Sequence, residues 1–131
     1  MRYLLDTNVC IAYLNGVGPI ARRLLALPKG SAAVSALTEG ELQFGAERSG
    51  RVEENRGRVE TFLQEIDVVP FDRLAARQFG LLKARLLAMG SPIPDFDIGI
   101  ASSALCRGLV LVSADRQMRQ IPDLLVEDWR R

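Results

Sequence analysis

The feature that most constrains the fold of this chain is the alternation of short apolar runs with helix-like segments. The apolar runs are continuous rather than alternating in polarity, which is typical of strands that are buried on both faces of a parallel sheet. We expect strands at residues 2–5, 32–34, 66–69, 109–112 and 124–126. Between them we expect helices at residues 9–14, 19–27, 38–48, 51–64, 73–89 and 95–107, and a turn or short helix at 115–120. This order predicts an α/β fold with three α/β/α layers and a mainly parallel sheet.

Size and composition narrow the class of protein further. A length of 131 residues favours a single domain spanning residues 1–131. The chain starts directly with a strand-like run and has no apolar run near the roughly 18 residues of a membrane span, so we expect a cytoplasmic protein. It contains no histidine, and its two cysteines, Cys10 and Cys106, form no metal-binding motif. A zinc site is therefore not indicated.

Four acidic residues lie where predicted strands end or predicted helices begin: Asp6, Glu41, Asp97 and Asp115. In parallel α/β sheets the functional crevice lies beyond the carboxyl ends of the strands, and all four positions are compatible with that edge. Four carboxylates can converge there only around a cation, and oxygen ligands suit Mg²⁺ or Mn²⁺. Without histidine, hydrolytic chemistry would have to use carboxylates and metal.

Each acid also has a simpler structural explanation when it is considered alone. Asp6 could cap a helix, and Glu41, in the first turn of its helix, could complete a capping box with Thr38. Asp97 could stabilise a helix dipole next to the cap Asp95, and the acid at position 115 could be a turn residue. The common structural level of the four acids is what favours a shared site.

The basic residues leave two explanations open. The net charge is only +1, but all of the 17 basic residues except Lys29 and Lys83 are arginines, which bind phosphate well. They could line a nucleic-acid groove, or they could form a solvated face with pairs within helices. The residues concerned are Arg22, Arg23, Arg48, Arg51, Arg56, Arg58, Arg116 and Arg119.

Four segments, taken in order, resemble the motifs of PIN-domain nucleases. They are Leu-Leu-Asp-Thr-Asn at residues 4–8, the segment 35–45, the segment 92–101 and Leu-Val-Ser-Ala-Asp at 111–115. The residues that follow, 121–129, resemble the tail of bacterial VapC-type toxins, so the resemblance covers the whole chain. The family's metal-site acids match Asp6, Glu41, Asp97 and Asp115. Two departures are Gly40, where the family has a better helix former, and Asp95, a second acid two residues before the preferred one.

The resemblance implies a PIN-like fold and a metal-dependent endoribonuclease, a hydrolase that uses Mg²⁺ or Mn²⁺. Asp6 and Asp97 would bind the metal, and Glu41 and Asp115 would complete the site directly or through water. Side chains that could hold these carboxylates in place are Thr7, Asn8 and Ser113. The resemblance also implies the toxin of a toxin–antitoxin pair. Such a toxin is usually a homodimer, is inhibited by a cognate antitoxin in a hetero-oligomer, and cuts structured RNA such as tRNA or rRNA.

Two other functions remain as alternatives. One is a catalytically inactive RNA-binding or interaction module of the same fold, although all four acids are present. The other is a phosphatase that uses Asp6 as its nucleophile. The dehalogenase-type phosphatases it would resemble carry a second Asp two residues later, where this chain has Asn8, which argues against this alternative.

Overall fold

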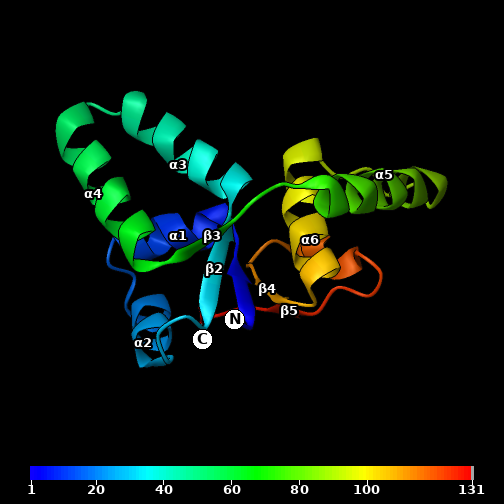
Figure 1. Ribbon diagram of the computed structural model, residues 1–131, viewed down its shortest axis with the longest axis horizontal. Helices are drawn as coiled ribbons and strands as arrows, with labels where there is room; N and C mark the ends of the chain where they lie inside the picture. The colour runs from blue at the N-terminus through cyan, green and yellow to red at the C-terminus, as the bar shows by residue number, and fades with distance from the viewer. Residues whose placement is uncertain (131) are drawn as a thin grey trace.

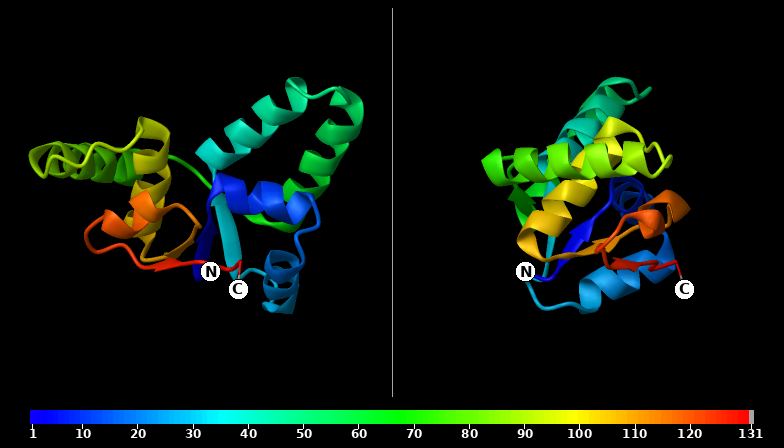
Figure 2. Two further views of the ribbon diagram at one scale, coloured as in Figure 1. Left: turned by 180° about the vertical axis from the view of Figure 1, so that it is seen from behind. Right: turned by 90° about the vertical axis from the view of Figure 1, so that its right-hand side faces the viewer.

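The computed structural model describes residues 1–130, and these form a five-stranded parallel sheet between two groups of helices (Figures 1 and 2). The elements in chain order are β1 (Tyr3–Leu5), α1 (Thr7–Leu14), α2 (Gly18–Ala26), β2 (Ala32–Ser35), α3 (Ala36–Glu47), α4 (Val52–Glu65), β3 (Asp67–Val69), α5 (Arg73–Ala88), α6 (Asp95–Arg107), β4 (Val110–Val112), the 3₁₀ helix η1 (Arg116–Gln120) and β5 (Val126–Glu127). The predicted three-layer α/β fold is confirmed.

The order of the strands, β3-β2-β1-β4-β5, places β1 at the centre of the sheet. The chain builds outward from β1 to β2 and β3 on one side, and β4 and β5 complete the other side. Leu5 pairs with Val112 in the parallel register of β1 and β4. The residues that follow these two strands, Asp6 and Ser113, therefore emerge next to each other at the carboxyl edge of the sheet, where such folds bind their ligands.

Each face of the sheet has its own hydrophobic core, which explains why the central strands β1 and β4 are apolar throughout. Leu4 packs into one cluster with residues of α5 and α6, and its neighbour Leu5 packs into the other with residues of α1 to α4. Both leucines are completely buried. Because successive side chains of a strand point to opposite faces, a strand covered on both sides must be apolar at every position.

The start of α3 differs from the prediction and changes the position of Glu41. Ser35 caps the helix, with its side chain accepting a hydrogen bond of 3.0 Å from the backbone N–H of Leu37. The helix consequently begins at Ala36, two residues earlier than predicted, and Thr38 is a buried helical residue. The prediction that Glu41 lies in the first helical turn was wrong.

Smaller differences occur at other element ends. The helix α1 begins at Thr7 rather than residue 9, because Asp6 already caps it. Pro94 is the cap of α6, so Asp95 is the first helical residue and not the cap as predicted. Gly108, with φ of 64°, ends that helix as expected, since glycine adopts this left-handed conformation without strain. The last strand covers Val126–Glu127 instead of residues 124–126.

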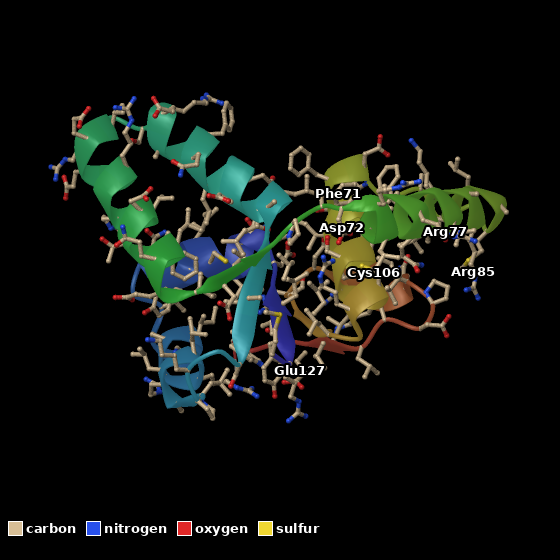
Figure 3. The ribbon with its side chains drawn as sticks, viewed as in Figure 1. Phe71, Asp72, Arg77, Arg85, Cys106 and Glu127 are labelled. Atoms are coloured by element: carbon tan, nitrogen blue, oxygen red, sulfur yellow. The ribbon has the colours of Figure 1, made fainter. Side chains whose placement is uncertain are left out.

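Helices α5 and α6 are joined at their polar ends as well as through the core. Asp72 caps α5, accepting a hydrogen bond of 3.0 Å from the N–H of Ala75. Its other oxygen lies 3.0 Å from the guanidinium of Arg107, at the end of α6. Figure 3 shows Asp72 and Phe71 at the start of α5, next to α6. This ion pair ties the end of α6, the helix that carries Asp97, to the start of α5.

The helix α5 is amphipathic, and its leucines are divided between core and surface. Leu82 and Leu86 are buried, whereas Leu81 and Leu87 are each 61% exposed. Across residues 1–130, no helix combines the length and the hydrophobicity that crossing a bilayer requires.

Candidate active site

The structure brings the four predicted acids together at the carboxyl edge of the sheet. Asp6 follows β1, Asp115 follows β4, and Glu41 and Asp97 lie on α3 and α6. The pKa of Asp97 is raised to about 6, first by burial and then by the negative charges of the other three acids. Asp97 therefore lies within electrostatic reach of the other three acids.

Asp6 is the most enclosed of these acids, with 7% of its surface exposed. One carboxylate oxygen accepts a hydrogen bond of 2.8 Å from the backbone N–H of Thr7, and the other accepts one of 2.8 Å from the hydroxyl of Ser113. Burial raises the pKa of Asp6, the two hydrogen bonds oppose this change, and the charge of Asp115 adds to it. Asp6 is thus a helix cap and a rigidly oriented site acid at the same time.

Ser113 links Asp6 to Asp115. While its hydroxyl donates to Asp6, its oxygen accepts a hydrogen bond of 3.1 Å from the backbone N–H of Asp115. Asp115 uses one carboxylate oxygen to cap η1 through the N–H of Gln117, at 2.9 Å. The turn explanation for Asp115 is therefore correct, but it uses only one of the two oxygens.

Glu41 makes a contact that the sequence did not indicate. Its carboxylate accepts a hydrogen bond of 2.6 Å from the hydroxyl of Thr7, across the interface between α3 and α1. The hydroxyl of Thr38 lies 3.0 Å from that of Thr7. The capping-box explanation is wrong, because Ser35 is the cap and the side chain of Glu41 points to another helix. Sequence reasoning considered Thr38 only as a cap and missed this contact.

Two other predicted residues lie apart from this hydrogen-bonded group. Asp95 is exposed and forms an ion pair of 3.0 Å with Lys83 of α5. Asn8 is exposed on α1, and no hydrogen bond within residues 1–130 ties its side chain to the acids.

Asp97 lies in the first turn of α6, so the helix dipole also stabilises its charge, as its simpler explanation proposed.

The residues present fit a hard divalent cation by their chemistry, since every candidate ligand is a carboxylate oxygen. No Lys or Arg of the described residues forms a salt bridge with any of the four acids. The repulsion among the four carboxylates is therefore not offset by an ion pair with a positively charged side chain. Within residues 1–130, no three acidic or cysteine side chains are arranged closely enough to hold an ion alone. This arrangement fits an ion with one or two direct carboxylate ligands and several waters, which is the usual environment of Mg²⁺.

Several of the predicted arginines form ion pairs with acidic side chains. Arg56 pairs with Glu47 at 2.6 Å and with Glu53 at 2.9 Å, as the alternative of a solvated, paired face proposed. Arg51 and Arg23 also form ion pairs, with Glu54 and Glu127. Arg116 directly follows Asp115 and is exposed.

An apolar groove opens beside the acids, between α1, α3 and α4. Its walls include Ile11, Leu14, Leu42 and Val59, and Glu41 forms part of its lining. The groove therefore adjoins the candidate active site.

The chain is similar to several known proteins. A family model described as PIN domain matches residues 3–124. A tRNA(fMet)-specific endonuclease VapC from Shigella flexneri is 35% identical over 130 residues, which cover 98% of both chains. The chain is similar to that of the DNA-bound VapBC structure from Salmonella typhimurium, with a TM-score of 0.94, 35% identity and 98% coverage of both chains. It is also similar to a chain of VapBC2 from Rickettsia felis bound to a promoter DNA fragment, with a TM-score of 0.92, 30% identity and coverage of 98% and 99%.

Proposed function

The chain belongs to the PIN domain family and is a VapC-type ribonuclease, and from that premise we propose that it is a metal-dependent endoribonuclease that cuts structured RNA. The observation that carries the metal-dependent mechanism is the group of four carboxylates at the carboxyl edge of the sheet, where burial and then the charges of the other three acids raise the pKa of Asp97 to about 6. Acids that are held together without a cationic side chain are suited to binding a divalent ion.

Asp6 and Asp97 are the proposed direct ligands of Mg²⁺ or Mn²⁺, and Glu41 and Asp115 would complete the site directly or through water. When bound, the ion supplies positive charge that offsets the negative charge developing on a phosphodiester during hydrolysis.

The chain's own side chains keep these acids in position for that reaction. Ser113 and the backbone of Thr7 fix both oxygens of Asp6, which removes its freedom to rotate. The hydroxyl of Thr7 holds Glu41 toward the same edge. Groups that are oriented before the substrate arrives lower the entropic part of the barrier.

The proposed substrate is structured RNA, either tRNA or rRNA. The Shigella relative is a tRNA(fMet)-specific endonuclease, which supports a tRNA substrate without identifying it. A net charge of +1 provides no general attraction to nucleic acid, so recognition would depend on local contacts and on RNA shape. The exposed guanidinium of Arg116, next to Asp115, is suited to contact a phosphate near the cut.

The proposed partners are a cognate antitoxin and a second copy of this chain. VapC-type ribonucleases are the toxins of toxin–antitoxin pairs, and the similar structures from Salmonella and Rickettsia are VapBC complexes. The groove beside Glu41 supports antitoxin binding, because an amphipathic helix can bury its apolar face between such walls. An antitoxin bound there would lie next to the acids and obstruct the RNA.

A cleavage assay tests this proposal. Purified protein without antitoxin is incubated with total cellular RNA in Mg²⁺, in Mn²⁺ or in EDTA, and the fragment ends are sequenced. The matched control is the Asp6→Asn/Asp97→Asn variant, which keeps the size of both side chains and removes their charge. We expect discrete cuts that require the metal and are absent with the variant.

The same assay separates the alternatives. If the protein makes no cuts with either metal, or the variant cuts equally well, the catalytic proposal is wrong and an RNA-binding module becomes the better account. Release of inorganic phosphate from small phosphoesters, without cuts in RNA, would instead indicate the phosphatase.

A further inference from the structure

We propose that Thr38 is a positioning residue for Glu41, acting through Thr7 by a chain of two hydrogen bonds that links α3 with α1. The inference rests on the proposed function, in which Glu41 is one of the site acids. The residue would not contact RNA or metal, and its effect would be on the orientation of the Glu41 carboxylate.

The direction of the two hydrogen bonds follows from proton counting. The hydroxyl of Thr7 donates to Oε1 of Glu41 at 2.6 Å. A threonine hydroxyl has one proton, so Thr7 has none left for Thr38. In the contact of 3.0 Å between the two hydroxyls, Thr38 must therefore be the donor and Thr7 the acceptor. The chain runs from Thr38 to Thr7 to Glu41.

The geometry of α3 explains why a residue inside the helix can do this. Because Ser35 caps the helix, Thr38 and Glu41 are both helical and three residues apart, which places them on one face. That face meets the first turn of α1, where Thr7 lies. Thr38 is completely buried and Thr7 is 8% exposed, so water has little access to replace either hydroxyl.

Two other completely buried hydroxyls inside a helix form a different kind of hydrogen bond. Ser102 and Ser103 on α6 are also completely buried, and each donates to a backbone carbonyl one turn earlier in its own helix, at 2.6 Å and 3.1 Å. This is the usual local arrangement for a hydroxyl inside a helix. Thr38 instead directs its proton to another helix, toward an acid of the site.

Removing the hydroxyl of Thr38 should leave the fold intact and loosen Glu41. Thr38→Val keeps the shape of the side chain, but the Thr7 hydroxyl then lacks the donor that fixes its orientation. We expect kcat for RNA cleavage to fall about tenfold, while KM changes little. A tenfold loss is at the lower end of what is typical when a residue that hydrogen-bonds to a metal ligand is replaced. Thr38→Ser, which restores the hydroxyl, should recover most of the activity. Ser103→Ala removes an equally buried hydroxyl and should leave kcat unchanged.

A double-variant cycle tests whether the effect passes through Thr7. Cleavage and urea unfolding are measured for the wild type, Thr7→Val, Thr38→Val and Thr7→Val/Thr38→Val. We expect the double variant to match Thr7→Val in kcat, and the shift in urea midpoint caused by Thr38→Val to disappear in that background. Unfolding gives a readout that does not depend on activity or metal.

Several results would overturn the inference. These are normal kcat in Thr38→Val, no recovery with Thr38→Ser, an equal loss in Ser103→Ala, or additive effects of the two threonine variants. An active wild type with any of these results refutes the role of Thr38 alone. A wild type that cuts no RNA refutes the proposed function, and the inference falls with it.

Discussion

Two glutamates of the same helix, α3, have opposite environments. Glu47, at the end of the helix, is half exposed and pairs with Arg56 at 2.6 Å, and this contact lowers its pKa. Glu41, nearer the start, bonds to a neutral hydroxyl, and its charge contributes to the raised pKa of Asp97. At the end of α3, Glu47 is paired with a positively charged side chain. At the sheet edge, Glu41 instead adds its negative charge to a group of acids that repel one another.

The same difference separates the site acids from acids elsewhere in the described chain. Asp72 and Asp128 lie beside arginines, and hydrogen bonds from backbone and guanidinium groups lower their pKa, to about 2 for Asp128. Asp6 and Asp97 have raised pKa values because burial and like charges oppose ionisation. The sheet edge therefore carries a cost to stability that the rest of the fold must offset, which is typical of functional sites.

The largest expected effect comes from exchanging the two glutamates of α3 for glutamine. Glu41→Gln should lower the rate of RNA cleavage by about a hundredfold or more, because it removes a charge from the site. Glu47→Gln, on the same helix, should leave the rate within about twofold, because it changes only a surface pair. Rates are compared in Mg²⁺ with protein of equal folded content. Similar losses in both variants would show that the two ends of α3 do not differ in function.

The pH dependence of stability should reveal the repulsion at the sheet edge. In EDTA, raised pKa values mean that the folded protein binds more protons than the unfolded chain between the usual value of 3.8 and about 6 for Asp97. The free energy of unfolding should therefore fall as the pH rises through this range, and Asp6 acts in the same direction. Asp97→Asn should flatten this fall and be more stable at neutral pH by on the order of 1–3 kcal/mol.

Urea unfolding in EDTA from about pH 4.5 to about pH 7.5 measures this linkage. Asp72, Asp128 and Glu47 have lowered pKa values, so their contributions change at lower pH, outside this interval. A wild-type stability that is constant or rises with pH in this interval would contradict the proposed repulsion.

The smallest expected effect concerns the approach of the two helices that carry Glu41 and Asp97. A Cβ at Gly99 of α6 would lie 2.5 Å from Cδ1 of Leu37 on α3, so Gly99→Ala must displace that leucine. Its cost should be roughly 1–2 kcal/mol, with a partial loss of cleavage as α3 shifts. Gly80→Ala on α5, where a Cβ meets nothing within 4 Å, should stabilise by up to about 1 kcal/mol. Equal stabilisation in both variants would show that Leu37 moves freely.

Local patterns were sufficient to predict the layers of the fold and the positions of the acids. The central strands β1 and β4 are apolar along their length because helices cover both faces of the sheet, and helices α5 and α6 have recognisable ends at Asp72 and Gly108. Asp6 directly follows β1, and Asp115 closely follows β4. Because the carboxyl ends of parallel strands lie at the same edge of a sheet, the two acids come to one edge. The errors at the starts of α3 and α6 arose because several residues there can cap a helix, and packing selects one of them.

Strands and helices are encoded largely by neighbouring residues, so the order of residues along the chain is enough to indicate which acids could form the site. How these acids are held depends on tertiary packing. Thr7 and Thr38 are 31 positions apart, and Ser113 is 107 positions from Asp6. Hydrogen bonds over such separations depend on how helices and strands pack, and a hydroxyl carries no sequence signal of its partner. The same packing separated Asp95, paired with Lys83, from Asp97 beside the other three acids.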